Sequence, residues 1–256
     1  MTLARIHEYL AALEEAVVDE VYPARHGMAL LTPSLPLVWQ LNALRVEDPA
    51  AGPAQLVEEA DRVLAELGHR KLVVHDAGLG ERLTRPLVAI GWNVLRLLVM
   101  VRDRPPEREI ADGAGAEVDR ELGAAGLAAF RREQPFGWQE EAVDQLAAMD
   151  ERFDRAAGAR DFGSPPAEPA CVCRLYNAPG LGQIDEVGTV EARRGEGHAS
   201  AAVLAAADAA AAEGRDPIFL LTDAADWPQH WYRTLGFSEI GSVYEFLKLP
   251  MGAAQP

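Results

Sequence analysis

The stretch that decides the fold is Arg194-Gly195-Glu196-Gly197-His198-Ala199, because it joins two segments of different character. An extended run, Gln183 to Val190, precedes it, and a series of strong helix formers, Ala199 to Ala212, follows it. The glycines are therefore predicted to lie where a strand turns into a helix. At such a junction the first backbone N–H groups have no intrahelical partner, the helix dipole adds positive charge, and glycine lets a large anion approach. With Arg193 beside Arg194, the pattern predicts a diphosphate site; the alternative is a glycine-rich loop that only begins a helix.

A second motif, Trp231-Tyr232-Arg233-Thr234-Leu235-Gly236-Phe237, follows after one predicted helix and one predicted strand. The pattern Arg-x-x-Gly-x-Ala followed by Tyr-x-x-x-Gly-Phe resembles the GCN5-related N-acetyltransferase (GNAT) family. The resemblance covers roughly residues 110 to 250 and implies an α/β fold with a mixed sheet, of the acyl-CoA N-acyltransferase type. Two residues depart from the family pattern: Glu191 stands where many members have proline, and Glu196 places an acid inside the loop.

The resemblance also implies a cofactor and a reaction. The first motif is expected to hold the pyrophosphate of acetyl-CoA through main-chain amides, and Tyr232 is expected to protonate the departing CoA thiolate, unless it is an aromatic packing residue. Acetyl-CoA would act as a co-substrate, and its acetyl group would pass directly to an amine of a small molecule or peptide in a ternary complex. The residues expected to bind acetyl-CoA are Thr189, Val190, Glu191, Arg194, Gly195, Glu196, Gly197, His198, Ala199, Ser200, Asp223 and Tyr232.

Transfer to an amine also needs a group that takes the amine proton and a donor that polarises the thioester carbonyl. Asp185 and Glu186 are both candidate bases, acting directly or through water, and the period of a strand predicts that they face opposite sides. Burial would raise the pKa of a carboxyl group there toward neutrality, whereas a solvated acid at the strand end is the alternative. The main-chain amides around Thr189 and Val190 are expected to polarise the carbonyl.

Composition limits the partners. The chain has 256 residues and a net charge of −16, which would repel nucleic acid and attract cationic molecules, although acidity of this size also promotes solubility. No apolar run is long enough to cross a membrane and no leader is recognisable, so we expect a cytoplasmic protein. Cys171 and Cys173 are expected to be small buried residues, and no metal site is expected. The sequence leaves a homodimer open.

An internal repeat predicts the domain organisation. The segment from Gly68 to Trp92 parallels that from Gly214 to Phe237, with Leu87 at the place of Tyr232. The turn from Asp48 to Pro53 stands where the second copy has its arginines and glycines. We therefore expect a degenerate GNAT-like half-domain over residues 1–105 and a catalytic GNAT domain over residues 106–256, with a linker near residues 103–115. A chance likeness between two strand-helix-strand units is the alternative.

Periodicity and turn residues predict the secondary structure. The helical region at 122–155, broken near 135–137, is expected to wall the acceptor pocket, with Phe130, Phe136, Trp138 and Phe153 as candidate contacts or as core residues. If turnover fails, the alternative is a catalytically silent acyl-CoA-binding or interaction module. Helices are predicted at 3–22, 55–67, 81–90, 122–155, 198–213 and 229–235; strands are predicted at 28–32, 37–46, 71–75, 92–101, 116–118, 170–176, 183–190, 218–222 and 237–249.

Overall fold

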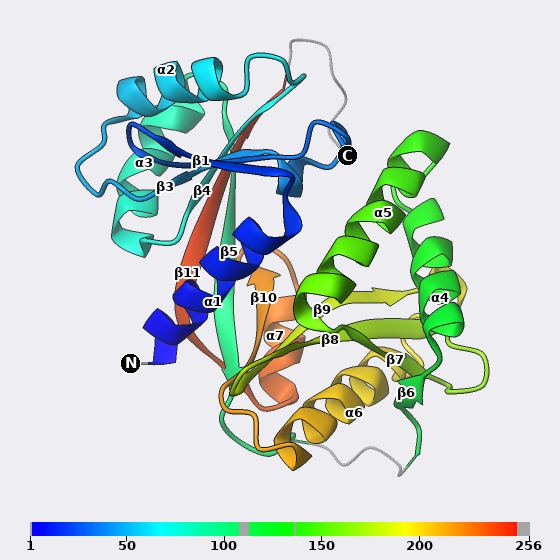
Figure 1. Ribbon diagram of the computed structural model, residues 1–256. Coiled ribbons are helices and arrows are strands. Elements are labelled where there is room, and N and C mark those ends of the chain that lie inside the picture. Colours follow the sequence, from blue (N-terminus) through cyan, green and yellow to red (C-terminus); the bar gives the residue numbers. More distant parts are fainter. Residues whose placement is uncertain (1, 108–112, 136, 250–256) are drawn as a thin grey trace. The chain divides into compact units, whose positions relative to one another are not determined.

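A computed structural model describes residues 2–107, 113–135 and 137–249 (Figure 1). The described residues form two compact units. The first combines residues 2–99 with 222–226 and 240–249, and the second combines the described residues of 100–221 with 227–239. Strands β5 (Asn93–Arg102), β10 (Ile218–Asp223) and β11 (Phe237–Lys248) therefore contribute residues to both units.

The first unit contains a mixed set of strands in the order β1-β2-β3-β4-β11. Its further strands are β1 (Glu20–Ala24), β2 (Gly27–Leu31), β3 (Ala43–Val46) and β4 (Arg70–Val74). Strands β3 and β4 run parallel, and the other neighbouring pairs are antiparallel. Strand β11 is thus needed to complete this set, because its residues Tyr244 to Lys248 pair with Val74 to Arg70.

Helices cover both faces of the first unit's strands. On one face, Leu44 and Val46 of β3 join the apolar core beneath α2 (Pro53–Val63) and α3 (Ala77–Ala89). Between them, Arg45 points the other way and donates to Ala11 O of α1 (Thr2–Val17) at 3.0 Å. A short 3₁₀ turn at Trp39–Leu41 leads into β3.

The second unit has the strand order β10-β9-β8-β7-β6. These are β6 (Ala116–Val118), β7 (Arg160–Ser164), β8 (Cys171–Ala178) and β9 (Leu181–Thr189), antiparallel to their neighbours except that β9 and β10 run parallel. Figure 1 shows α6 (His198–Ala212) against one face and α4 (Arg120–Arg132) with α5 (Glu140–Ala157) against the other. The alanines of α6 allow close approach to the strands, and seven of its residues are buried.

Several sequence expectations need correction. The first helix ends at Val17 and not near residue 22, because the chain enters β1, an edge strand in which Pro23 is tolerated. The predicted strand at 37–46 contains the 3₁₀ turn, so that only its end is extended. Strand β7 was not predicted, since its polar residues carry no apolar alternation. The break near 135–137 is confirmed, because α4 and α5 are separate helices.

The expected repeat has a structural counterpart in the order of the elements. The series β2-β3-α2-β4-α3-β5 of the N-terminal half matches the series β8-β9-α6-β10-α7-β11 of the C-terminal half, where α7 spans Pro228–Thr234. In each series an antiparallel pair is followed by a parallel pair. The last strand of the second series, however, pairs with β4 of the first. The boundary at residues 105/106 remains a prediction, and residues 108–112 of the expected linker lie outside the described residues.

Candidate functional site

The glycine-containing loop has the geometry that the sequence predicts. A short 3₁₀ turn, Glu191–Arg193, connects β9 to the loop, and α6 begins at His198. Gly195 and Gly197 have φ angles of +81° and +87°, a region that only glycine adopts freely, and a Cβ atom on either would meet nothing within 4 Å. The first intrahelical hydrogen bond reaches Gly197 O from Ala201 N at 3.1 Å. The three preceding amides therefore lie at the positive end of α6.

The charged side chains of this loop are held by neighbours. Arg193 donates to Glu196 Oε2 at 2.8 Å and contacts His198 Nε2 at 2.9 Å. Arg194 is largely exposed, donates to Thr189 O at 3.2 Å and lies 4.0 Å from Glu133 Oε2. An exposed pair of this kind contributes little stability, so that an arriving phosphate can compete for the arginine.

Strand β9 separates from β10 near the loop. The parallel ladder joins Gly182–Ile184 to Ile218–Leu220, while β9 continues to Thr189. The amide of Val190 is not free to polarise a thioester carbonyl, as the sequence suggested, because it donates to Ala170 O at 3.0 Å. The prediction that the Val190 amide polarises the thioester carbonyl is therefore wrong. The last residues of β9 remain paired with β8, and Val190 remains bonded to Ala170, just before β8.

The expectation that Asp185 and Glu186 face opposite sides is also wrong. The register between β8 and β9 shifts between Val172 and Arg174, and Glu186 has a φ angle of +51°. This bulge interrupts the alternation of the strand. Asp185 is the cross-strand partner of Arg174, whose side chain contacts α5, and Glu186 pairs with Arg131 of α4. Both carboxyl groups therefore lie on the face covered by α4 and α5.

Asp185 has the more unusual environment. Its Oδ2 accepts from Gln183 Nε2 at 2.9 Å, and its Oδ1 accepts from the backbone N–H of Glu186 at 2.8 Å. Burial of the carboxyl group, together with the negative charge of Glu186, raises the pKa of Asp185 to about 7. A carboxyl group with this pKa exchanges protons near neutral pH, as a general base requires.

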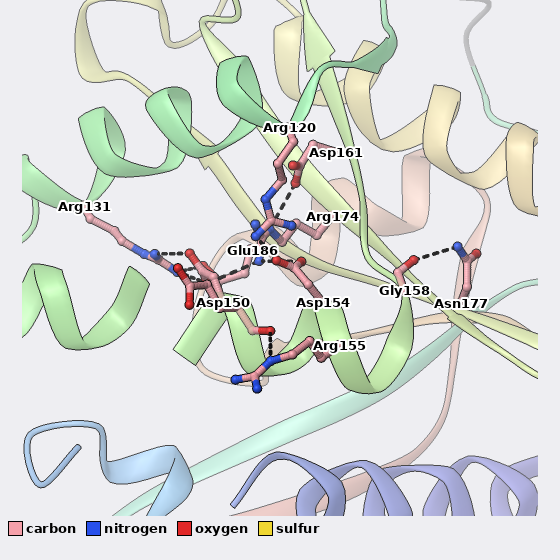
Figure 2. Close-up of polar contacts among 11 residues, drawn as sticks. Arg120, Arg131, Asp150, Asp154, Arg155, Gly158, Asp161, Arg174, Asn177 and Glu186 are labelled. Atoms are coloured by element: carbon pink, nitrogen blue, oxygen red, sulfur yellow. Dashed lines mark hydrogen bonds and ion pairs between the residues drawn. The ribbon is translucent and has the colours of Figure 1, made fainter. Parts of the chain in front are cut away.

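Glu186 belongs to a network of buried charges that the sequence did not reveal (Figure 2). Arg131 binds Asp150 through two hydrogen bonds of 2.6 and 2.9 Å, and it also binds Glu186 at 2.9 Å. Arg174 is fully buried, donates to Asp161 at 3.0 Å and lies 3.3 Å from Asp150. One signal could have revealed it: Arg174 stands alone among apolar residues in a strand that the pattern marks as buried.

Tyr232 lies in α7 and is 6% exposed. Its ring packs against Trp231 and Phe237 at centroid distances of 4.6 and 6.0 Å, and Trp231 Nε1 donates to Ser200 Oγ in the first turn of α6 at 3.0 Å. Burial raises the pKa of Tyr232 above its usual value, so the hydroxyl keeps its proton. The contacts agree with packing and leave the role of an acid as a prediction.

The remaining predicted residues lie in several places. Asp223 belongs to the first unit, where its Oδ1 accepts from Ala225 N at 2.8 Å. Phe153 stacks on Tyr176, and the ring of Phe130 lies 2.5 Å from where a Cβ atom on Gly188 would stand, so both are packing contacts of the second unit. Trp138 is 79% exposed, Cys171 and Cys173 are buried free thiols, and Phe136 lies outside the described residues.

In the first unit, the loop before α2 corresponds to the glycine-containing loop before α6, but its backbone N–H groups already have partners. Gly52 N donates to Gln55 Oε1 at 2.9 Å, and Ala50 N donates to Asp48 Oδ1 at 2.9 Å. Pro53 begins α2 and has no N–H group. These donors are already used within the loop, and Asp48 adds a negative charge there.

No protein-family model and no curated protein matches the sequence. Solved structures are similar over nearly the whole chain. A GCN5-related N-acetyltransferase from Kribbella flavida is 19% identical, covers 98% of this chain and 96% of its own, and has a TM-score of 0.64. A conserved protein of unknown function from Staphylococcus epidermidis is 14% identical over 91% of this chain and 95% of its own, with a TM-score of 0.71.

The chain therefore has the fold of the GNAT acetyltransferases, as the two motifs indicate. The similar structures also include a tandem GNAT protein from the clavulanic acid biosynthesis pathway, 12% identical over 90% of this chain and 80% of its own, with a TM-score of 0.50. Within the described residues, no helix is long and apolar enough to cross a membrane.

Proposed function

We propose that the protein transfers the acetyl group of acetyl-CoA to an amine of a small molecule or peptide. The observation that carries this proposal is the loop before α6, where Gly195 and Gly197 hold positive φ angles and leave open space where a side chain would stand. A pyrophosphate is a doubly charged group of the size that such a helix start accepts.

The cofactor contacts follow from this placement. The amides of His198, Ala199 and Ser200 would bind the pyrophosphate, and Arg194 would add a charged contact in exchange for its weak pair with Glu133. Thr189, Val190, Glu191 and Glu196 remain proposed contacts from β9 and the turn, through atoms other than the N–H groups of Val190 and Glu191, which donate to Ala170 O and Glu133 Oε2. Asp223 and Tyr232 remain proposed contacts from β10 and α7.

The reaction would proceed by direct attack. The amine nitrogen forms a bond to the thioester carbonyl carbon, Asp185 takes the proton that the amine loses, and the bond between carbon and sulfur breaks. Tyr232 gives its proton to the departing thiolate and recovers one from solvent. We favour Asp185 over Glu186 as the base because Glu186 is held in an ion pair with Arg131, whereas Asp185 has a pKa near neutrality.

We further propose that residues 1–105 are a degenerate GNAT-like half and that residues 106–256 carry the catalysis. The support is the loop before α2, whose amides are used by Asp48 and Gln55 and whose negative charge would repel a pyrophosphate. One acetyl-CoA per chain is expected.

Turnover tests the proposal. Purified protein is mixed with acetyl-CoA and a panel of amines, and release of free CoA thiol is followed against samples without amine. Amine-dependent release that disappears in Asp185→Asn supports the proposal. CoA binding without turnover of any amine would instead identify a catalytically silent acyl-CoA-binding module, and absence of CoA binding would refute both.

A further inference from the structure

Arg131 links three elements of the second unit through charged contacts (Figure 2). The residue lies near the end of α4 and is 5% exposed. The two Nη atoms of Arg131 donate hydrogen bonds to both carboxylate oxygens of Asp150 on α5, and Nη2 of Arg131 also donates to Glu186 Oε2 on β9. A guanidinium held by two parallel bonds has little freedom to turn. Its third contact is therefore aimed at Glu186 by Asp150.

The position of Glu186 matters because of its neighbour. With a φ angle of +51°, Glu186 turns its side chain to the same face as Asp185, and its charge acts directly on that carboxyl group. A left-handed conformation is uncommon for a residue other than glycine and persists only where surrounding contacts stabilise it. The bond from Arg131 is such a contact.

The balance of charge in the network also favours a proton on Asp185. Among the described residues, the ion pairs of this network join the carboxyl groups of Asp150, Asp154, Asp161 and Glu186 to only three arginines, Arg120, Arg131 and Arg174. Asp185 adds a fifth carboxyl group beside Glu186. Buried carboxylates in excess of cations favour retention of a proton. Burial raises the pKa of Asp161 too, but Asp161 is paired with Arg174, and Asp150 and Glu186 have Arg131 between them. Arg174 also lowers the pKa of Asp185, its cross-strand partner, but in the described structure no arginine lies within ion-pair distance of Asp185. The proton is therefore best accommodated on Asp185.

We propose that Arg131, anchored by Asp150, is a positioning residue that holds the negative charge of Glu186 beside Asp185 and so makes Asp185 the proton acceptor for the amine. The inference rests on the proposed acetyl transfer. Arg131 would touch neither substrate and would act only through Glu186.

Two single substitutions should shift the ascending limb of kcat/KM against pH in opposite directions. Arg131→Gln removes a positive charge, so the carboxyl pair holds its proton to a pH about 1 unit higher. Asp150→Asn keeps a side chain of the same shape but removes a negative charge, so the limb moves to lower pH by about 0.5–1 unit. Asp150→Asn also keeps the measurement possible if Arg131→Gln does not fold, and Arg131→Lys should restore most of the wild-type profile.

A double substitution tests whether the effect passes through Glu186. In a Glu186→Gln background, Arg131→Gln should no longer move the limb, because the charge that Arg131 holds is gone. Arg120→Gln is the matched control: it also removes an arginine of α4, but one that contacts Asp154 and not Glu186, so it should move the limb much less than Arg131→Gln does.

Titration without substrate separates this inference from the proposed function. The carboxyl carbon of Asp185 is followed by ¹³C NMR, with Asp185→Asn used for assignment. The expected result is the same pair of opposite shifts, whether or not an amine acceptor is known. If Arg131→Gln and Asp150→Asn lower thermal stability but leave both the titration and the pH profile unchanged, the positioning role is refuted and Arg131 only joins α4 to α5. A titration that shifts without any turnover of amines would refute acetyl transfer and leave the electrostatic arrangement intact.

Discussion

Gly197→Asp should weaken CoA binding with little effect on the fold. A side chain at this position enters open space, since a Cβ atom would meet nothing within 4 Å. The new carboxylate would accept hydrogen bonds from the backbone N–H groups of Ala199 or Ser200, which are the donors that a pyrophosphate needs. It would also stand close to the phosphates. The substitution thus removes donors and adds repulsion at the same place.

The magnitude follows from the exposure of the loop. A unit charge about 4 Å from another contributes about 1 kcal/mol in water and about 4 kcal/mol near a protein surface. Repulsion from a diphosphate at this exposed loop is therefore about 2–4 kcal/mol, which corresponds to a 30- to 1000-fold increase in Kd. The positive φ angle of +87° adds about 1 kcal/mol of strain to the folded state, with or without ligand.

Calorimetry with CoA measures the effect, and the other end of the helix provides the control. Gly214 follows α6, has a φ angle of +73° and also leaves open space, so Gly214→Asp carries the same strain far along the helix from the predicted phosphates. Gly214→Asp should bind CoA as the wild type does. Equal affinity of the wild type and Gly197→Asp, or equal losses in both variants, would refute the assignment of the phosphate site.

Three further predictions concern other parts of the second motif and the base. Tyr232→Phe should keep CoA affinity and lower kcat by about 10- to 1000-fold if the hydroxyl protonates the thiolate, and an unchanged kcat would make Tyr232 a packing residue. The raised pKa of Asp185 means that the folded state holds an extra proton between about pH 4 and 7. As pH rises through that window, the stability of the wild type should therefore fall by on the order of 3 kcal/mol relative to that of Asp185→Asn. If the urea midpoints of the two proteins changed by the same amount between about pH 5 and pH 8, this prediction would be contradicted. Gly236→Ala should lower Tm clearly more than Gly91→Ala, because both have positive φ but only the former brings a Cβ atom to 2.1 Å from Arg104 O; equal losses would argue against that contact.

Local sequence signals were sufficient for the loop and its helix. Gly195 and Gly197 can be recognised because their conformations strongly favour glycine, and the alanines after them are strong helix formers. The two motifs also stand at a spacing that a single helix and strand can fill. These features depend on neighbours in the chain, which is why the fold could be inferred from them.

Features that depend on distant residues were missed. The bulge at Glu186 has no local signature, because a glutamate rarely adopts a positive φ and the contact from Arg131 comes from 55 residues away. Without it, the rule of alternation placed Asp185 and Glu186 on opposite faces. Strand β7 was missed for a similar reason, since the burial of Asp161 depends on Arg174 in the next strand. Long-range ion pairs replace the apolar pattern on which sequence reasoning relies.

The pairing of β11 with β4 has a consequence for synthesis of the chain. Val74 leaves the ribosome early, but its partner Tyr244 follows about 170 residues later, which at 5–20 residues per second is roughly 10–30 s. During that interval an open strand edge with apolar residues such as Leu72 has no native neighbour on one side. The nascent N-terminal half is therefore a candidate client for holding chaperones, and a premature stop codon before residue 244 would leave it incomplete although all of residues 1–105 had been made.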